Sequence, residues 1–348
     1  MKNFILALIC VFLLTGCSKS GNVTVNNENT PTEILTLMSS KSTSLNKIWI
    51  GTFQLVFNNL KNEIIKHDIK FANEAMTDDL RGLNSEEFNS SMLNEESYYT
   101  STGETSPEAK NKIKADIKAK FNETSDIIDS FDWTKAPGNY YAYAMLKKEF
   151  EFLKVFDVLN NSAFNNSEKQ YKYFGIKKHD DKNLSSNVRV LFYNNKDNYA
   201  IRLNTKNNDE VYLYRTDDNS DFKTLYLKMQ SDNRKYEGSY SFSENDSLKI
   251  PYIKIDTKRD YKELCNKSIE GSDFQISAAL ETIKLELTEK GGKVKSEAII
   301  MLENAAFEEP KEAREFNFDK TFVMFLVDSG KDDPYFALRI GNLDEFQK

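Results

Sequence analysis

Few residues of this chain carry side chains suited to enzymatic chemistry. Its only two histidines, His67 and His179, have polar neighbours and are expected to be exposed. The chain therefore offers few histidines from which a zinc site or a Ser-His-Asp triad could be built. Two pairs of adjacent acids, Asp217-Asp218 and Asp332-Asp333, would suit metal binding or acid–base catalysis, but both patterns are more typical of solvated turns. The sequence therefore predicts no enzyme, no catalytic residue, no metal and no cofactor.

The amino terminus carries a clearer chemical signal. Lys2 precedes an apolar run from Phe4 to Leu14, which is too short to span a bilayer and is typical of a signal peptide, here residues 1–16. The sequence Leu-Thr-Gly-Cys that ends at Cys17 resembles the bacterial lipoprotein box, which implies cleavage before Cys17 and attachment of diacylglycerol and palmitate-type chains. Such lipid would anchor the protein to the extracytoplasmic face of a bacterial cell membrane. An ordinary secreted protein with a chance cysteine is the alternative.

The remaining cysteines and the charge balance narrow the class of protein further. Cys10 leaves with the signal peptide, so Cys265 has no partner for an intramolecular disulfide and is expected to be a small buried hydrophobe. The 348 residues are 39% hydrophobic and 29% charged, which is enough for a substantial core. The formal net charge is -7 with no basic block, so nucleic acid is not an expected partner. We expect a monomer.

The chain in front of the carboxy-terminal part supplies the elements that would position any site. Residues 17–43 are rich in Asn, Ser, Thr and Lys and predict a flexible tether. Apolar residues at helical spacing predict a helix from Leu45 to Lys66, and Ser106-Pro107-Glu108 begins a second helix that continues to Phe121. Further strands are expected at Val188–Tyr193, Tyr199–Leu203, Glu210–Arg215 and Leu248–Asp256, and a short helix is expected around Phe222–Met229.

The carboxy-terminal part combines strands with an unusually long connection. Strands are predicted around Ile283–Leu287, Phe318–Val327 and Tyr335–Ile340. The segment from Gly291 to Glu315 exceeds the median loop of about 4–6 residues, so we expect it to be exposed and functional. In an extended chain, small or apolar residues (Gly292, Val294, Ser296, Ala298) would share one face and charged residues (Lys293, Lys295, Glu297) the other. This pattern suits a ribbon that enters a sheet; a helix, or a disordered linker, remains open as an alternative.

This order of elements resembles the layout of the serpins. The resemblance covers roughly Glu108–Leu343, through a charged helix, a central strand at Tyr140–Leu146, the pair Phe156-Asp157, the hairpins and the closing strands. Its best part is the tail, with Phe318, Lys320 and Phe322 followed by Tyr335-Phe336. The resemblance implies an α+β fold in a domain of residues 44–348, with large mixed β-sheets, amino-terminal and peripheral helices and a long exposed loop near the carboxy terminus.

The sequence also departs from the serpin pattern. Thr321 replaces the usual Pro, and Leu338 replaces a Gly. Glu281 stands at the place of a histidine beneath the main sheet, and Tyr143 at that of an asparagine. These changes affect the polar latch that would control loop insertion.

The serpin resemblance implies a mechanism without catalytic residues. In that family a serine or cysteine protease attacks the exposed loop, and the loop then inserts into a sheet as an added strand and traps the acyl-enzyme. Within a reactive-loop-like segment at 289–315, the implied hinge residues are Gly291, Gly292, Val294, Ser296 and Ala298. The candidate scissile region contains Met301, Leu302, Ala305, Ala306 and Phe307, and the family's usual register favours Ala305-Ala306. No Lys or Arg lies between Ser296 and Glu309, so a trypsin-like target is not expected.

Two functions from different classes remain. The first is a membrane-anchored suicide inhibitor of serine or cysteine proteases. The alternative is a non-inhibitory lipoprotein that binds a ligand or a partner at the cell surface.

Overall fold

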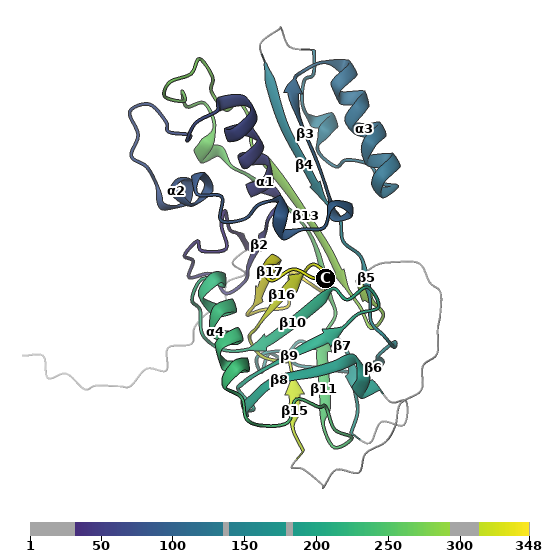
Figure 1. Ribbon diagram of the computed structural model, residues 1–348. Helices are drawn as coiled ribbons and strands as arrows, with labels where there is room; N and C mark the ends of the chain where they lie inside the picture. Colours follow the sequence, from purple (N-terminus) through teal and green to yellow (C-terminus); the bar gives the residue numbers. More distant parts are fainter. Residues whose placement is uncertain (1–31, 135–138, 179–183, 293–312, 348) are drawn as a thin grey trace, which may run out of the picture.

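A mixed seven-stranded sheet forms one end of the molecule (Figure 1). The computed structural model describes residues 32–134, 139–178, 184–292 and 313–347. The strands of this sheet are, in spatial order, β1 (Glu33–Ile34), β2 (Lys47–Ile50), β17 (Pro334–Ile340), β16 (Phe322–Val327), β10 (Glu210–Arg215), β9 (Asn198–Asn204) and β8 (Val188–Asn195). β1 is parallel to β2 and the other neighbours are antiparallel.

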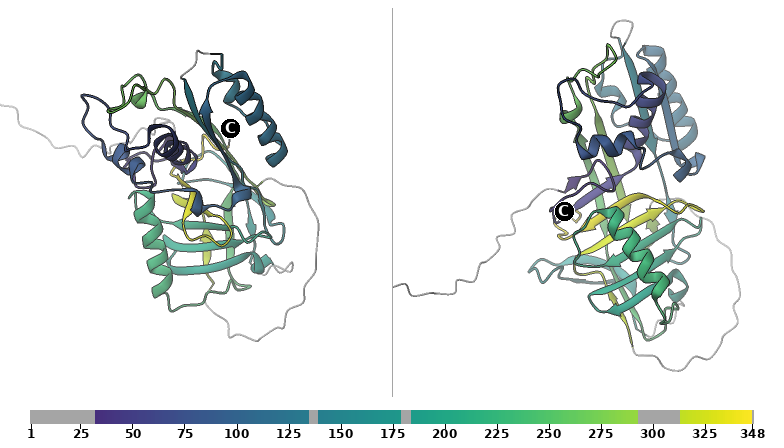
Figure 2. Two further views of the ribbon diagram at one scale, coloured as in Figure 1. Left: turned by 45° about the horizontal axis from the view of Figure 1, so that its top comes forward. Right: turned by 60° about the vertical axis from the view of Figure 1, so that its left-hand side comes forward.

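Four smaller sheets surround this one. Their strands are, sheet by sheet, β15 (Glu315–Asn317), β11 (Ser247–Pro251), β7 (Tyr171–Ile176) and β6 (Asp157–Ser162); β12 (Ile253–Asp260) and β13 (Leu280–Leu287); β3 (Tyr98–Glu104) and β4 (Tyr140–Leu146); and β14 (Gly291–Gly292) and β5 (Phe150–Glu151). The described helices lie mainly at the opposite end from the seven-stranded sheet, whereas α4 covers that sheet (Figure 2). The expected α+β class with large mixed sheets is confirmed.

The helices begin where local capping signals occur. α3 (Pro107–Phe121) is capped by the Ser106 hydroxyl, which accepts a hydrogen bond from the Ala109 amide, and α4 (Phe222–Lys235) is capped in the same way by Asp221. The other helical segments are α1 (Thr52–Asn59), a π-helical turn at Leu60–Ile65, α2 (Asp78–Asn84), and short 3₁₀ turns at Ser90–Met92, Glu95–Ser97, Ile128–Ser130, Leu184–Asn187 and Lys262–Leu264. Within the described ranges, none of these helices has the length and apolar character that crossing a membrane requires.

Three apolar clusters hold the elements together. The largest lies around the seven-stranded sheet and includes Trp49, Phe192 and Phe325. A second contains Phe53 and Tyr261, and a third joins α3 to β4 through Ile113, Ile117 and Tyr143. β4 therefore buries Tyr143 against α3, whereas its neighbour Ala144 faces the largest cluster, as expected for the alternation of side chains along a strand.

Three sequence predictions need correction. The helix expected from Leu45 begins only at Thr52, because Lys47–Ile50 form β2 and pair with the distant β17. The single strand expected at 248–256 is divided at Tyr252 into β11 and β12, which belong to different sheets. Part of the predicted tether is packed: Ile34, Leu35 and Leu37 are only 7%, 3% and 3% exposed, because their apolar side chains enter the core.

Candidate functional site

The candidate site is a groove between two strands whose facing edges have no strand partner. Within the described residues, β4 pairs only with β3 and β13 pairs only with β12. A cavity of about 1320 Å³ lies between them and is lined by both strands, by α1 and by residues 123–133. Unpaired backbone N–H and C=O groups at a strand edge are a template for another strand. The groove can therefore accept an extended peptide backbone.

The two walls of the groove present different chemistry to their two sides. On the α1 side, β13 contributes Ile283 and Leu287, both buried in the largest apolar cluster, and β4 contributes Ala144. On the α3 side, β13 contributes the exposed Lys284, whose ammonium lies 2.9 Å from Asp126. A strand that alternates small and charged residues would match these two sides.

The predicted hinge begins at one end of this groove with a tight turn. Thr288 and Gly291 exchange backbone hydrogen bonds of 3.0 and 3.2 Å, which encloses a two-residue turn of Glu289 and Lys290. Gly291 has a φ of +126°, and a Cβ there would lie 2.3 Å from the carbonyl oxygen of Phe150. Only glycine is therefore compatible with this position.

Gly291 and Gly292 are buried, although the sequence predicted an exposed segment from Gly291 onward. The physical reason is that both glycines form β14, which pairs antiparallel with Phe150–Glu151 of β5. Gly292 also lines the groove. The chain thus turns back beside the end of β13 at Gly291 and Gly292.

A hydrogen bond fixes the side chain of Glu289 in this turn. The hydroxyl of Tyr252 donates to Glu289 Oε2 at 2.9 Å. Burial and this contact with a carboxylate raise the pKa of Tyr252 to about 12, so the hydroxyl keeps its proton at neutral pH. The amides of Phe152 and Phe156 donate to the carbonyls of Lys290 and Glu289. The turn is thereby held from both its side chain and its backbone.

The far end of the connection is held by Arg314. Its guanidinium donates to Asp246 Oδ2 at 2.7 Å and to the carbonyls of Ser239 and Ser241 at 2.8 and 2.6 Å. The next residues, Glu315–Asn317, form β15 and pair with β11. The connection between Gly292 and Arg314 therefore has two anchored ends.

Glu281 lies in the wall of the groove at the place where the family pattern has a histidine. It is 4% exposed and accepts hydrogen bonds from the Phe53 amide at 3.0 Å and from the Tyr261 hydroxyl at 2.9 Å. Burial raises its pKa from 4.5 to about 7 in spite of these donors. The Glu281 carboxyl group thus joins β13 to the first turn of α1 and to Tyr261. Tyr143, at the place of the family's asparagine, points instead to the α3 side, where its hydroxyl donates to Ser125.

A buried ionic cluster lies just beyond the end of β4. The ammonium of Lys148 lies 2.8 Å from Asp209 and 2.7 Å from Asp328, and the two carboxylates are 2% and 0% exposed. Burial opposes ionisation of Asp328, but hydrogen bonds from Lys148, Asn94 and Ser97 outweigh it and lower its pKa to about 2. The cluster joins the end of β4 to the ends of β10 and β16.

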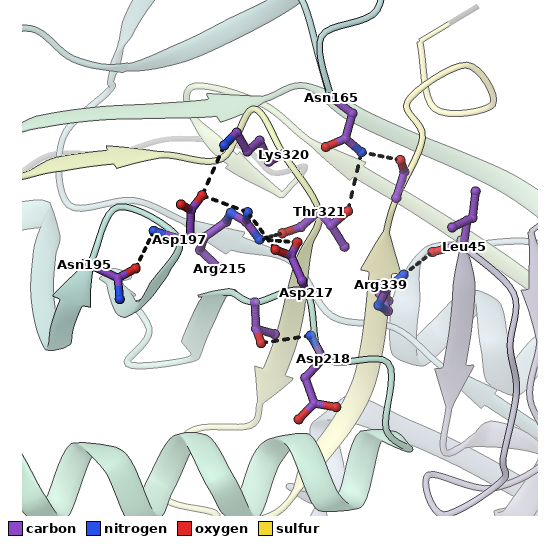
Figure 3. A network of polar contacts seen from close by, with 12 residues as sticks. Leu45, Asn165, Asn195, Asp197, Arg215, Asp217, Asp218, Lys320, Thr321 and Arg339 are labelled. Carbon is purple, nitrogen blue, oxygen red and sulfur yellow. Dashed lines mark hydrogen bonds and ion pairs between the residues drawn. The ribbon is translucent and has the colours of Figure 1, made fainter. Parts of the chain in front are cut away.

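Of the two acidic pairs that suggested an enzyme, Asp217-Asp218 is occupied by structural contacts (Figure 3). Asp217 binds the buried guanidinium of Arg215 at 2.7 Å, and Asp218 accepts from Ser220 and Lys228. Asp332 uses its backbone carbonyl to accept the Tyr226 hydroxyl. In the part of the chain that the structure describes, no group of three or more His, Cys, Asp or Glu residues is placed to hold a metal ion.

Several predicted site residues lie outside the described residues, and nothing in the structure bears on them. These are the lipidation residue Cys17, the hinge residues Val294, Ser296 and Ala298, and the candidate scissile residues Met301, Leu302, Ala305, Ala306 and Phe307. Conversely, sequence reasoning missed Asp126, Lys148 and Tyr252. Each of them acts through a partner far along the chain, so no local pattern could have revealed it.

No family model matches this sequence, and no curated protein matches it. Solved structures are similar in fold. The thermophilic serpin tengpin, in its native state, is 12% identical, and the match covers 88% of this chain and 91% of that one with a TM-score of 0.49. Serpin48 of the insect Tenebrio molitor is 14% identical over 86% of this chain and 75% of that one, with a TM-score of 0.42. Thyroxine-binding globulin in complex with thyroxine is 13% identical, with a TM-score of 0.42, and the match covers 68% of this chain and 64% of that one.

Proposed function

We propose that this chain, whose fold is similar to that of serpins, is a suicide inhibitor of serine or cysteine proteases. Residues 301–307 contain the peptide bond that the protease cleaves. After cleavage, the chain from residue 293 onward inserts between β4 and β13 as an added strand. The protease is carried along as an acyl-enzyme, and distortion of its active site stops hydrolysis. The inhibitor itself contributes no catalytic group.

The observation that carries this proposal is the groove between β4 and β13, with the start of the predicted hinge at Gly291 and Gly292 beside it. β4 and β13 each present a free edge to the same cavity, and the turn at Thr288–Gly291 is followed by Gly292, which lines that cavity. An inserted strand would satisfy the backbone groups of both edges and fill the cavity with Val294, Ser296 and Ala298. Both changes lower the free energy of the inserted state relative to the intact one. A trap needs this difference in free energy to hold the protease.

We also propose that lipid on Cys17 holds the inhibitor at the extracytoplasmic face of a bacterial membrane. The lipoprotein box and the apolar run before it support this assignment. An inhibitor at that place would meet proteases outside the cytoplasm, so its partners are the membrane and a protease with a preference for small or apolar residues.

The test is incubation of the full chain, in detergent, with elastase-, chymotrypsin- and subtilisin-like serine proteases and a papain-like cysteine protease. We expect an adduct that survives SDS with at least one of them, and a cleaved chain with a higher Tm than the intact one. Ser296→Arg, which places a charge on the inward face, should be cleaved as well but form little adduct. Glu297→Arg is the matched control, because its side chain would face outward, and it should behave as wild type. Cleavage without adduct and without a rise in Tm would refute the proposal.

One observation favours the second function, that of a non-inhibitory binding protein. The cavity of about 1320 Å³ is large enough to hold a small molecule, because typical small-molecule sites measure ~300–1,000 Å³. If a ligand occupies it instead of a strand, the intact chain should be stabilised by that ligand, and cleavage of the connection should leave the Tm unchanged.

A further inference from the structure

The strand β12 has one edge that the described residues leave largely open. Its only strand partner among them is β13, on the other edge. On the open side, the amide of Lys254 donates to the carbonyl of Phe346 at 3.1 Å. Backbone groups alternate in direction along a strand, so those of Asp256, Lys258 and Asp260 point to the same side as the Lys254 amide. No hydrogen bond joins these backbone groups to another described residue, which makes this edge a template for a further strand.

The side chains on the outer face of β12 alternate in the sign of their charge. They occupy every second position of the strand, and all four are exposed: Lys254, Asp256, Lys258 and Asp260. The alternation continues onto β13, where Glu286 stands opposite Lys254 and Lys284 stands opposite Asp256. Opposed residues of opposite charge stabilise an antiparallel pair of strands. A further strand on the open edge would therefore be favoured if it continued the alternation.

A second copy of β12 continues it. In two antiparallel copies related by a two-fold axis at Thr257, Asp256 of each copy stands opposite Lys258 of the other. Their backbone groups face each other, so each of these two pairs can exchange two hydrogen bonds. The side chain of Lys254 is exposed and is opposite in sign to Asp260 of the second copy, which would stand beside it. The edge is thus complementary to itself, as the surface of a two-fold dimer must be.

We propose that the open edge of β12 is a dimerisation surface and that its partner is a second copy of this chain. Residues 256–258 of the two copies pair as antiparallel strands, with Thr257 on the two-fold axis. The dimer replaces the monomer that the sequence predicts. This inference goes beyond the proposed function and requires neither cleavage nor insertion of the connection after Gly292.

Other alignments of the two edges are opposed by charge or by shape. A parallel copy would place every charge opposite its own like. An antiparallel copy shifted by two residues would oppose Lys258 to Lys258 or Asp256 to Asp256. A shift by four residues would press the copy against Phe346 or against the 3₁₀ turn at Lys262–Leu264. Edge strands with charges of a single sign repel every copy, whereas this alternation admits one alignment.

The pairing is short, because Phe346 already takes the amide of Lys254. An interface of this extent is typical of a weak or transient association. Copies held on one membrane by the proposed lipid at Cys17 would meet at a higher effective concentration, which favours the dimer. The experiment must therefore trap the dimer covalently.

Disulfide trapping of the full chain in detergent, in a Cys265→Ser background, tests the alignment. Thr257→Cys places one cysteine opposite its own copy at a Cα separation of ~4.5 Å, within the range of a disulfide. Thr282→Cys is the matched control, because Thr282 is also half-buried but lies on β13. Its two copies would be three strand spacings apart, ~14 Å, which is too far for a disulfide. We expect oxidation to give a disulfide dimer of Thr257→Cys and little dimer of Thr282→Cys.

Charge exchange tests the complementarity. Adding Asp256→Lys or Lys258→Asp to Thr257→Cys turns two exposed pairs of each dimer from attractive to repulsive, so the yield should fall by about three- to tenfold. Combining Asp256→Lys with Lys258→Asp restores opposite charges and should restore the yield. Raised salt should lower the yield of the original Thr257→Cys chain.

Equal yields from Thr257→Cys and Thr282→Cys would show random collision and overturn the inference, as would a yield that the exchanged charges do not restore. If Thr257→Cys impairs folding as judged by circular dichroism, a mixture of Asp256→Cys and Lys258→Cys chains tests the same alignment on the outer face. That mixture should give more dimer than either variant alone, and no such excess would overturn the inference. Formation of a protease adduct is measured separately, so either proposal can fail without the other.

Discussion

Glu281 is the residue at which burial and charge conflict most directly. An acid whose pKa is raised on folding binds its proton more tightly in the native state, so the native state loses stability as pH rises. For Glu281 the loss occurs between about pH 4.5, where the unfolded chain ionises, and about pH 7, where the folded chain does. The two donors to its carboxylate reduce the loss without removing it.

We expect Glu281→Gln to remove a pH-dependent loss in the free energy of unfolding on the order of 3 kcal/mol. This is the free energy that corresponds to a pKa shift of Glu281 from 4.5 to about 7. The variant should gain stability over wild type at pH 8 and show little gain at pH 4.5. Urea unfolding at several pH values measures this. Glu286→Gln, on the same strand but exposed, is the control and should leave the profile unchanged. Parallel profiles for wild type and Glu281→Gln would contradict the assignment.

Substitution of Gly291 tests whether the turn depends on the backbone conformation of this residue. Gly291→Ala adds a Cβ 2.3 Å from the Phe150 carbonyl oxygen at a φ of +126°, so both contact and conformation oppose it. Gly330→Ala also has a positive φ, +70°, but its Cβ would meet nothing within 4 Å. We expect Gly291→Ala to cost more than the ~1–3 kcal/mol of backbone strain alone and Gly330→Ala to stay within that range, as measured by urea unfolding. Equal costs would show that the turn can relax.

At the scale of elements, the buried cluster at Lys148 joins β4 to the seven-stranded sheet. Lys148→Met would leave Asp209 and Asp328 buried without a cation, which typically costs ~3–5 kcal/mol. Lys147→Met is the matched neighbour: the Lys147 side chain is 26% exposed and its ammonium pairs with Glu123 and Glu149, so its removal should cost less than ~1 kcal/mol. Thermal and urea unfolding of the two variants give the comparison, and similar losses would refute the distinction.

Elements whose signals are local could be predicted, and elements that depend on distant partners could not. Ser106 and Pro107 fix the start of α3 through contacts within one turn, so the sequence placed it correctly. Trp49 lies at helical spacing from Phe53, yet it belongs to β2 because that strand pairs with β17. At the site, Gly291 stood out by residue type, whereas the link between Asp126 and Lys284 depends on two segments that only the fold brings together.

At the scale of the whole molecule, the proposed lipid on Cys17 would determine where the proposed inhibitor acts. Cys17→Ser removes the acceptor sulfur, so we expect the variant to leave the membrane fraction while its domain still folds. Phase partition in a detergent that separates on warming measures this, with Cys265→Ser as a control that should remain in the detergent phase. Equal partition of Cys17→Ser and wild type would rule out the anchor.

The two-residue turn has a kinetic consequence for the whole molecule. An inserting segment that is joined to its neighbouring strand by a short turn can pair with that strand one residue at a time. Each new pair of residues is then only slightly farther apart along the chain than the pair before it. Such stepwise closure avoids the entropy of joining distant segments, which slows most sheets. The outcome would then depend on how quickly this closure proceeds compared with release of the protease, and slow closure would leave an ordinary substrate.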